Sequence, residues 1–581
     1  MRDLTNKTIA DSRGLLVMLA VSLTLTSMLV ACGDSSSSSR SSGNAYAGEA
    51  DNKTDADFEM PADTDGDNIL NSDDVDDDGD GLIEIRSAAE LDMIRNNLAG
   101  TGFSDTFGGL GSAQGCNGVS YLDDLSSVTD VCLGYELETD ISLSNYSNWR
   151  PIGACSGTTI LGTADTPSNI VCSEDSSFTA IFEGNNHTIS DLNIIMTGAD
   201  KYGVGLFGTI ASGAVLRNVH LQNVAINRQS ATEGWFVGSV VGVAQNGTIH
   251  SISTDGGSVV GSGYVGGLIG LADGGTLIEK SSASLSMVEG RYKNVGGLVG
   301  HASDCVIESS FASINSVSST EDSGGSAGGL AGALINCDVR NVHSEMTGIF
   351  SKNQYVGGLV GVSDNSTISA AAALSGTIVT EASFAGGLAG MAIDSRIATS
   401  LSVSGEIIGL NSVSGFAGIV AGNSSIDSSY AMRLTFSGAA PSGFITTASD
   451  ADITLRNSYY VSTNEDKLWM GDSIPQVYDS YWDSNYSAAA TNANARTSEQ
   501  LQVGLSSSGD FSGDFMHWGE GWCNPATGEF TRVRDIAESG GYDDNPAWNL
   551  GDDTQYPTTR CIEDFPDGLQ LELMELFFGQ I

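Results

Sequence analysis

The amino-acid sequence predicts an all-β solenoid of repeats of about 30 residues, with a short capping helix before the repeats and an irregular, aromatic cap after them. The first observation is a glycine-rich phrase, clearest at residues 264–270, that recurs eight times and ends at Gly208, Gly242, Gly270, Gly300, Gly332, Gly361, Gly390 and Gly422. These glycines are 34, 28, 30, 32, 29, 29 and 32 residues apart, and a fixed period of this size is typical of stacked repeats. The second observation is that alternating apolar and polar residues follow the phrase, as at residues 306–314, which is the period of a β-strand.

Two columns of residues support this alignment of the repeats. The aliphatic column is Leu206, Val240, Leu268, Leu298, Leu330, Leu359, Leu388 and Val420, which we expect to fill one interior. The column before the glycines is Tyr202, Phe236, Tyr264, Asn294, Ser326, Tyr355, Phe384 and Phe416. Its aromatic members could stack on one another or bind sugars, and the breaks at Asn294 and Ser326 favour stacking. Each repeat is long enough for three short strands and three turns, and the paired glycines permit close packing.

The remaining elements follow in order along the chain. Ser87 and Glu90 form the pattern of a capping box, so we expect a short helix over residues 88–98. Residues 135–143 and 178–194 alternate apolar and polar positions, which predicts the first coils. After Met432 the period fades into an aromatic segment, which we expect to cover the last strand edge. The predicted domains are a signal peptide (1–31), a tether (32–60), an acidic segment (61–84), the capping helix with the first coils (85–200), the repeats (201–432) and the C-terminal cap (433–581).

Length and charge exclude some classes of function. The chain has 581 residues and a formal charge of −48, from 72 acidic and 24 basic residues. Such a chain repels nucleic-acid phosphates and anionic lipid headgroups, so no nucleic-acid partner is expected. The same charge suits the binding of cations or an environment rich in salt.

The N-terminal segment has the features of an export signal. Three basic residues precede an apolar run over residues 15–30, and this run is short for a membrane-spanning helix. Residues 29–32, Leu-Val-Ala-Cys, resemble the bacterial lipobox, which implies cleavage of residues 1–31 and lipidation of Cys32. Gly33 after this cysteine resembles lipoproteins of the outer membrane, and we expect the protein to face the cell exterior. A serine-rich tether follows, within residues 32–60. The alternative is an ordinary signal peptide with an incidental cysteine.

Eight further cysteines in an exported chain favour disulfides. Proximity in sequence suggests the pairs Cys116–Cys132, Cys155–Cys172 and Cys523–Cys561. Cys305 and Cys337 each lie five residues after a closing glycine, so we expect them in the same place in consecutive coils. Stacked strands lie about 4.8 Å apart, a spacing that allows either a bridge or two free, buried thiols.

Residues 61–84 predict a calcium-binding segment. The candidate ligands are aspartates at alternate positions, several followed by glycine: Asp63, Asp65, Asp67, Asp74, Asp76, Asp78 and Asp80. Alternate side chains can converge on one ion, and glycine permits the sharp turn. Glu84 falls one place short of the closing glutamate of an EF-hand, and the segment more closely resembles thrombospondin type 3 repeats. The alternative is a solvated acidic linker that binds no specific ion.

The recurring Gly-Gly-Leu-Val-Gly phrase resembles the GLUG-motif repeat of bacterial surface proteins. Residues 81–85, 182–189 and 548–557 also resemble segments that flank such repeats. The resemblance covers roughly residues 80–560. It implies a right-handed parallel β-helix-like rod on secreted or anchored proteins, which are often adhesins. Similar repeats accompany zinc metallopeptidases that cleave IgA, but this chain contains no His-Glu-x-x-His.

These observations predict a lipid-anchored surface protein that mediates attachment or biofilm contact through a rod stiffened by calcium. Its partners would be the membrane, through Cys32, and a glycan or an extracellular protein. A passive surface spacer is one alternative. A polysaccharide lyase or glycoside hydrolase is another, since parallel β-helices host such enzymes. The six histidines lack metal-ligand spacing, and we expect His301 to be a solvated turn residue.

Overall fold

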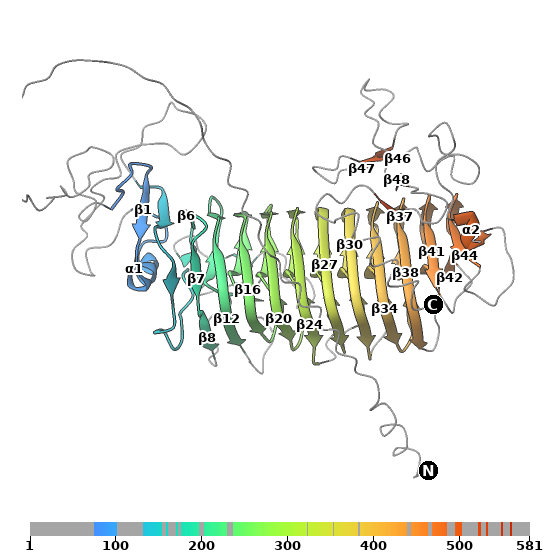
Figure 1. Cartoon of the computed structure of the whole chain (residues 1–581), viewed down its shortest axis with the longest axis horizontal. Coiled ribbons are helices and arrows are strands. Elements are labelled where there is room, and N and C mark those ends of the chain that lie inside the picture. The colour runs from blue at the N-terminus through green and yellow to red at the C-terminus, as the bar shows by residue number, and fades with distance from the viewer. Residues whose placement is uncertain are drawn as a thin grey trace, which may run out of the picture. The chain divides into compact units, whose positions relative to one another are not determined.

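The computed structural model divides the chain into Met1–Met60 and Pro61–Ile581, and the second unit contains all the elements below. The structure describes residues 75–101, 132–153, 176–196, 203–228, 236–321, 324–352, 354–381, 384–438, 443–462, 468–484 and 494–501, with short strands at 159–160, 170–171, 521–523, 530–532, 548–549 and 558–559. The fold is a parallel β-solenoid whose coils stack along one axis (Figure 1).

Two of the three large sheets contain at most one strand from each coil. The ten-stranded sheet contains β10 (Phe207–Ile210), β14 (Val241–Gln245), β18 (Ile269–Asp273), β22 (Val299–Ser303), β26 (Ala331–Ile335), β29 (Val360–Asp364), β32 (Ala389–Ile393), β36 (Ala417–Ala421), β39 (Ile445–Thr447) and β42 (Trp469–Gly471). The eight-stranded sheet contains β9 (Gly203–Val204), β13 (Phe236–Val237), β17 (Tyr264–Gly266), β21 (Val295–Gly296), β25 (Ser326–Gly328), β28 (Tyr355–Gly357), β31 (Phe384–Gly386) and β35 (Ser412–Ser414).

The third sheet has 25 strands in two parallel ladders. One ladder contains β1 (Leu82–Ile85), β2 (Gly134–Leu137), β6 (Ile181–Glu183), β11 (Val215–Arg217), β15 (Thr248–His250), β19 (Leu277–Glu279), β23 (Val306–Glu308), β33 (Arg396–Ala398), β37 (Asn423–Asp427), β40 (Asp452–Arg456) and β43 (Gln476–Tyr478). The other contains β3 (Ile141–Ser142), β7 (Thr188–Ser190), β8 (Asn193–Met196), β12 (His220–Arg228), β16 (Ser253–Val260), β20 (Ser282–Gly290), β24 (Phe311–Ser319), β34 (Leu401–Gly409), β38 (Tyr430–Gly438), β41 (Tyr459–Ser462), β44 (Tyr481–Asp483) and β45 (Ala495–Arg496). Two long strands, β27 (Asp338–Ser351) and β30 (Thr367–Thr380), belong to both ladders.

The coils from β9 to β35 therefore have three faces, as the repeat length predicted, but the strand of the third face is bent. Ser309, between β23 and β24, has a φ of +48°, and the equivalent Asn341 and Ala370 within β27 and β30 have φ values of +51° and +49°. This left-handed conformation turns the chain while both halves stay in one sheet. Four strand segments per coil thus form three sheets.

Parallel pairing confirms the predicted register for most repeats. Tyr264 lies beside Phe236 on neighbouring strands, and Phe384 lies beside Tyr355. The alignment of the eighth phrase was wrong. Ala389 pairs with Ala417, so Leu388, one residue earlier, lies beside Phe416 and not beside Val420. The eighth phrase thus spans residues 412–418 and ends four residues earlier than predicted. Phe416 belongs to the interior, where it stacks on Phe444 at 4.6 Å between ring centroids.

The interior is a continuous aliphatic core that runs through every coil. The predicted column from Leu206 to Leu388 is at most 1% exposed, which confirms its place in this core. Gly297 shows why the phrase needs glycine: a Cβ atom there would overlap the carbonyl oxygen of Gly329 in the next coil.

The predicted capping helix forms near the N-terminal end of the solenoid (Figure 1). It comprises α1 (Ala88–Met93) and the 3-10 turn η1 (Ile94–Asn96). The Ser87 hydroxyl accepts a hydrogen bond from the Glu90 N–H at 3.3 Å. The Glu90 carboxylate accepts one from the Arg86 N–H rather than from that of Ser87. Leu91 and Ile94 are fully buried, and the helical segment ends at Asn96, two residues before the predicted end.

Regular coils continue beyond Met432, where the sequence period fades, because parallel pairing extends from β38 to β45. The helix α2 (Ser498–Leu501) follows β45. Three short antiparallel pairs lie outside the coils: β4 (Thr159–Ile160) with β5 (Ile170–Val171), β46 (Gly521–Cys523) with β47 (Phe530–Arg532), and β48 (Trp548–Asn549) with β49 (Thr558–Thr559). Trp548 is fully buried beside Tyr430 and Tyr459, at 5.9 and 5.8 Å between ring centroids.

Candidate metal centre

A short acidic turn, residues 75–81, leads directly into β1. The Glu84 N–H on this strand donates to the Val75 carbonyl at 3.0 Å, so the turn curls back along β1. Gly79 and Gly81 have φ values of +74° and +90°, which only glycine adopts easily. The Asp76 carboxylate accepts hydrogen bonds from the N–H groups of Asp80 and Gly81, both at 2.9 Å. The Asp76 carboxylate and the two glycines therefore shape the turn.

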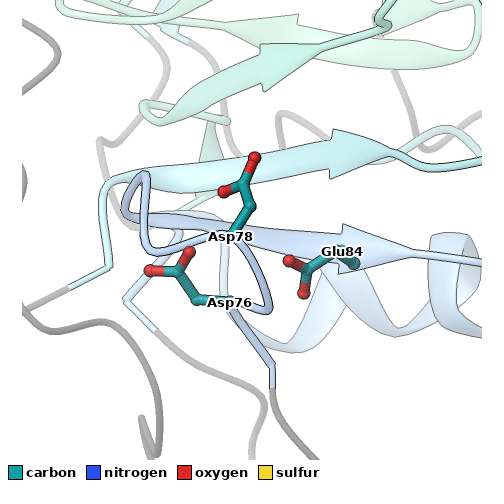
Figure 2. Close-up of side chains that lie close together, drawn as sticks. All are labelled: Asp76, Asp78 and Glu84. Carbon is teal, nitrogen blue, oxygen red and sulfur yellow. The ribbon is translucent and has the colours of Figure 1, made fainter. Parts of the chain in front are cut away.

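Two groups of carboxylates converge at this turn. In the first, one oxygen each from Asp76, Asp78 and Glu84 lies within 4.8 Å of the others (Figure 2). In the second, Asp78, Asp80 and Glu136 meet the same criterion. Asp76 and Asp78 lie on the turn, whereas Glu84 lies on β1 and Glu136 on β2. The solenoid strands thus contribute candidate ligands that oppose those of the turn.

The two glutamates belong to a column that runs along one face of the solenoid. Glu84 pairs in register with Glu136, and Glu136 with Glu183, so three carboxylates occupy neighbouring parallel strands. All three residues are buried, at 4%, 6% and 5% exposed. Like charges directly opposite one another destabilise a sheet, and burial increases their repulsion.

Each glutamate of the column is compensated differently. Glu183 forms an ion pair with Arg217 at 2.5 Å and accepts further bonds from Asn185 and Asn218. Glu136 accepts a bond from the Asn185 side chain at 2.7 Å.

Glu84 is the least compensated of the three. Its Oε1 accepts a hydrogen bond from the Asp77 N–H, but its Oε2 is buried without a hydrogen-bond partner. The nearest cationic group to Oε2 is the Arg86 guanidinium at 3.8 Å, and Arg86 also pairs with Asp77 and Glu138. One buried carboxylate oxygen therefore faces the cluster with little compensation.

Burial also determines the protonation of this cluster. Desolvation, with the charges of Asp80 and Asp78, raises the pKa of Asp76 to about 7. Desolvation, with the charge of Asp80, raises the pKa of Glu136 to about 7. Desolvation likewise raises the pKa of Glu84 well above its usual range. A bound cation would reverse these shifts, because it stabilises the ionised carboxylates.

The structure brings together part of the predicted ligand set and adds to it. Asp76, Asp78 and Asp80 converge, whereas Asp63, Asp65, Asp67 and Asp74 lie outside the described residues. Sequence reasoning noted Glu84 only as a failed EF-hand match and missed Glu136. Both glutamates lie at outward-facing positions of their strands, and both strands lie next to the acidic turn. That adjacency depends on the stacking of β1 on β2.

The cysteine predictions have separate outcomes. Cys132 is disulfide-bonded, while Cys32, Cys116, Cys155, Cys172 and Cys561 lie outside the described residues. Cys523 ends β46, and its side chain is not described. Cys305 and Cys337 lie in consecutive coils as predicted, buried and as free thiols with their Sγ atoms 2.8 Å apart.

A polar groove crosses the solenoid at the junction of β27, β30 and β33. Its volume is about 470 Å³, and its lining includes Asn336, Arg340, Asn365, Arg396 and Phe530. The Arg396 guanidinium lies over the Phe530 ring at 5.7 Å from the centroid, and no described carboxylate forms an ion pair with it. Arg340 is paired with Glu308 at 3.1 Å. Sequence reasoning missed this groove, because its residues come from three coils and a distant strand.

No helix among the described residues is long and apolar enough to cross a membrane. No family model matches the chain. A segment of 163 residues is 32% identical to Halomucin of Haloquadratum walsbyi. The matched segment covers 27% of this chain and 2% of the length of Halomucin. The chain thus corresponds to a very small part of that relative. A solved structure, described as a candidate immunoglobulin A1 protease from Bacteroides ovatus, has a TM-score of 0.31 and 15% identity, and the alignment covers 82% of this chain and 92% of that one.

Proposed function

We propose that this protein is a surface-anchored rod that attaches its cell to an extracellular ligand, with a lipid on Cys32 as the anchor and calcium at the base of the rod. The observation that carries the proposal is the continuous solenoid, with its dry interior and polar outer columns. Ten stacked strands at about 4.8 Å per coil span roughly 50 Å. Such a rod holds a ligand-binding surface at a distance from the membrane.

The groove at Arg396 is the attachment site in this proposal, and an acidic glycan is its ligand. Amide and hydroxyl side chains line it, and the Phe530 ring offers an aromatic face. This mixture of hydrogen-bonding groups and one aromatic ring suits a saccharide. A guanidinium that pairs with no carboxylate in the described part of the chain suits an acidic sugar, because it can pair with carboxylate or sulfate oxygens.

The test is a binding screen of residues 32–581 against glycans and matrix proteins, with and without calcium. We expect binding to a uronate-containing or sulfated glycan, and R396A should weaken this binding at least about tenfold through loss of the charge-assisted contact. R291A is the matched control, because Arg291 is also an exposed arginine but lies outside the groove and pairs with Glu321.

Three results of the same screen would contradict the proposal or its assigned site. Absence of binding to every ligand would favour a passive spacer. Breakdown of a polysaccharide would favour the lyase or hydrolase interpretation. Binding that R396A and R291A weaken equally would exclude the groove as the attachment site.

A further inference from the structure

We propose that two calcium ions clasp the acidic turn to the first two coils, one among Asp76, Asp78 and Glu84 and the other among Asp78, Asp80 and Glu136. This inference deepens the proposed function, because it specifies how calcium stiffens the rod. The sequence pattern placed the ions within a loop of aspartates. The structure instead brings the candidate ligands together between the turn and the solenoid strands.

The first step of the argument is charge. Five carboxylates meet at the turn and the ends of β1 and β2, and the nearby Arg86 is already engaged by Asp77 and Glu138. Asp76 and Glu84 are 0% and 4% exposed, so water does not screen their repulsion. A hard divalent cation bound by oxygen ligands neutralises such a group without a conformational change.

The second step is the oxygen of Glu84 that has no hydrogen-bond partner, an observation that is independent of the acidic composition. Glu84 is an outward residue of a strand, yet its side chain is only 2% exposed and its Oε2 has no hydrogen bond. A buried carboxylate oxygen without a hydrogen bond costs several kilocalories per mole in an apolar environment. It lies with Asp76 and Asp78 in the first carboxylate group, where an ion would bind it.

The third step is position. Among the described strands, β1 pairs only with β2, so its other edge is the open end of the solenoid. Residues 75–77 lie along that edge, joined to it by the bonds between Glu84 and Val75 and between Asp77 and Glu84. Ions that bind the turn to both β1 and β2 therefore hold a cover over an edge that could otherwise pair with another chain.

The test uses the mature chain, residues 32–581, freed of metal by chelation, with E84Q and E136Q as variants. Gln keeps the shape and the hydrogen-bond acceptor but removes the charge. E308Q is the matched control, since Glu308 lies in the same outward column of the sheet but pairs with Arg340. In calorimetric titration with calcium, each of E84Q and E136Q should lose one ion or bind it at least about tenfold more weakly, while E308Q matches the wild type. Unchanged stoichiometry and affinity in both variants would overturn the clasp.

Thermal unfolding separates metal binding from a merely structural role. In chelator, E84Q and E136Q should unfold at or above the wild-type midpoint, because Gln carries no carboxyl group whose ionised form is destabilised by burial and by the neighbouring carboxylates. In calcium, the wild type should be the most stable of the three. Variants that are less stable than the wild type in both conditions would contradict the proposal. Equal affinity for magnesium would overturn the assignment to calcium, since magnesium demands a more rigid octahedral site.

These measurements need no extracellular ligand, so the two proposals can fail separately. Calcium binding that depends on Glu84 and Glu136 would stand even if the glycan screen found nothing. Glycan binding through Arg396 would stand even if calcium bound only to aspartates outside the described residues.

Discussion

At the scale of single residues, His301 and Asn294 form a polar pair where the aromatic column is interrupted. Phe236 and Tyr264 stack at 5.4 Å, and Tyr355 and Phe384 stack at 5.7 Å, which confirms the predicted aromatic stacking. Between these pairs, the Asn294 side chain lies 2.9 Å from Nδ1 of His301. The Asn294 carbonyl oxygen accepts bonds from the Ser326 backbone N–H and hydroxyl. The expectation that His301 is a solvated turn residue was wrong: it lies on β22 and is 2% exposed.

We predict that His301 makes the protein less stable as the pH falls. Burial lowers its pKa from 6.5 to about 4. The unfolded chain therefore binds the proton first, and the stabilisation present above pH 6.5 is lost between that value and about pH 4. The full effect is about 3 kcal/mol, at 1.36 kcal/mol for each pKa unit.

The measurement is the free energy of unfolding of the wild type and of H301N between pH 4 and pH 7.5. The variant lacks the titrating group, so the stability difference between the two proteins should change with pH in this window. Tyr264 packs edge-on against the His301 ring, at 5.1 Å between ring centroids. A pH-independent difference would show that His301 is not held in its neutral form.

At the scale of structural elements, ladders of buried hydroxyl groups follow the corners of the coils. The backbone N–H of Cys337 donates to the Ser366 hydroxyl, that of Ser366 to Ser395, and that of Ser395 to Ser424. Cys305 and Cys337 continue this column toward the N-terminal end. Each of these side chains accepts a hydrogen bond from the preceding coil and donates one to a nearby carbonyl. It thereby satisfies backbone N–H and C=O groups that strand pairing leaves unpaired at a corner.

We predict that Cys305 and Cys337 form a disulfide when the protein is exported to an oxidising compartment. Their sulfur atoms are 2.8 Å apart on neighbouring coils, so bond formation at about 2.05 Å needs only a small movement. The hydrogen bond to Cys337, and then burial, raises the pKa of the Cys305 thiol, so oxidation should be slow once the coils have closed. Alkylation of the denatured, unreduced protein followed by mass spectrometry would detect the bridge as two unlabelled cysteines.

The C305S variant is the control for this prediction. Serine fits the hydroxyl ladder, so in reducing buffer the variant should lose little stability, about 1 kcal/mol or less. In oxidising buffer the wild type should be the more stable by a larger margin. Labelling of both cysteines in the exported wild-type protein would show that the column holds free thiols.

At the scale of the whole solenoid, each coil contacts mainly its two neighbours. Stability in such a fold is the sum of terms from each coil and each interface, so the ends are held by one neighbour and the middle by two. The long strands β27 and β30, which pair along their full length, lie in the central coils. The middle of the rod should therefore be its most stable part.

We predict that hydrogen exchange will be slowest in β24, β27 and β30 and faster toward β1 and β45. Central coils open only when both neighbouring interfaces break, whereas terminal coils fray one at a time. Calcium should slow exchange selectively in β1 and β2 if the clasp holds them. Uniform exchange along the chain, measured by peptide mass spectrometry, would instead indicate one cooperative unit.

The sequence by itself determined the solenoid, because a repeated pattern of glycines and aliphatic residues specifies the same contacts in every coil. The repeat length, the interior column from Leu206 to Leu388, the stacked aromatics and the neighbouring positions of Cys305 and Cys337 all follow from periodicity. Periodicity failed at the eighth phrase, where residues 416–422 imitate the motif but the paired strands select residues 412–418. Pattern matching could not separate the two, because the interior accepts either Phe416 or a leucine.

Only the tertiary structure decided which residues meet outside the repeat pattern. Glu84 and Glu136 are 52 positions apart in the sequence and become neighbours because β1 stacks on β2. Arg396 and Phe530 meet in the groove through packing of a strand that lies outside the coils. Contacts of this kind depend on how non-repeating segments pack against the coils, and no local periodicity encodes that packing.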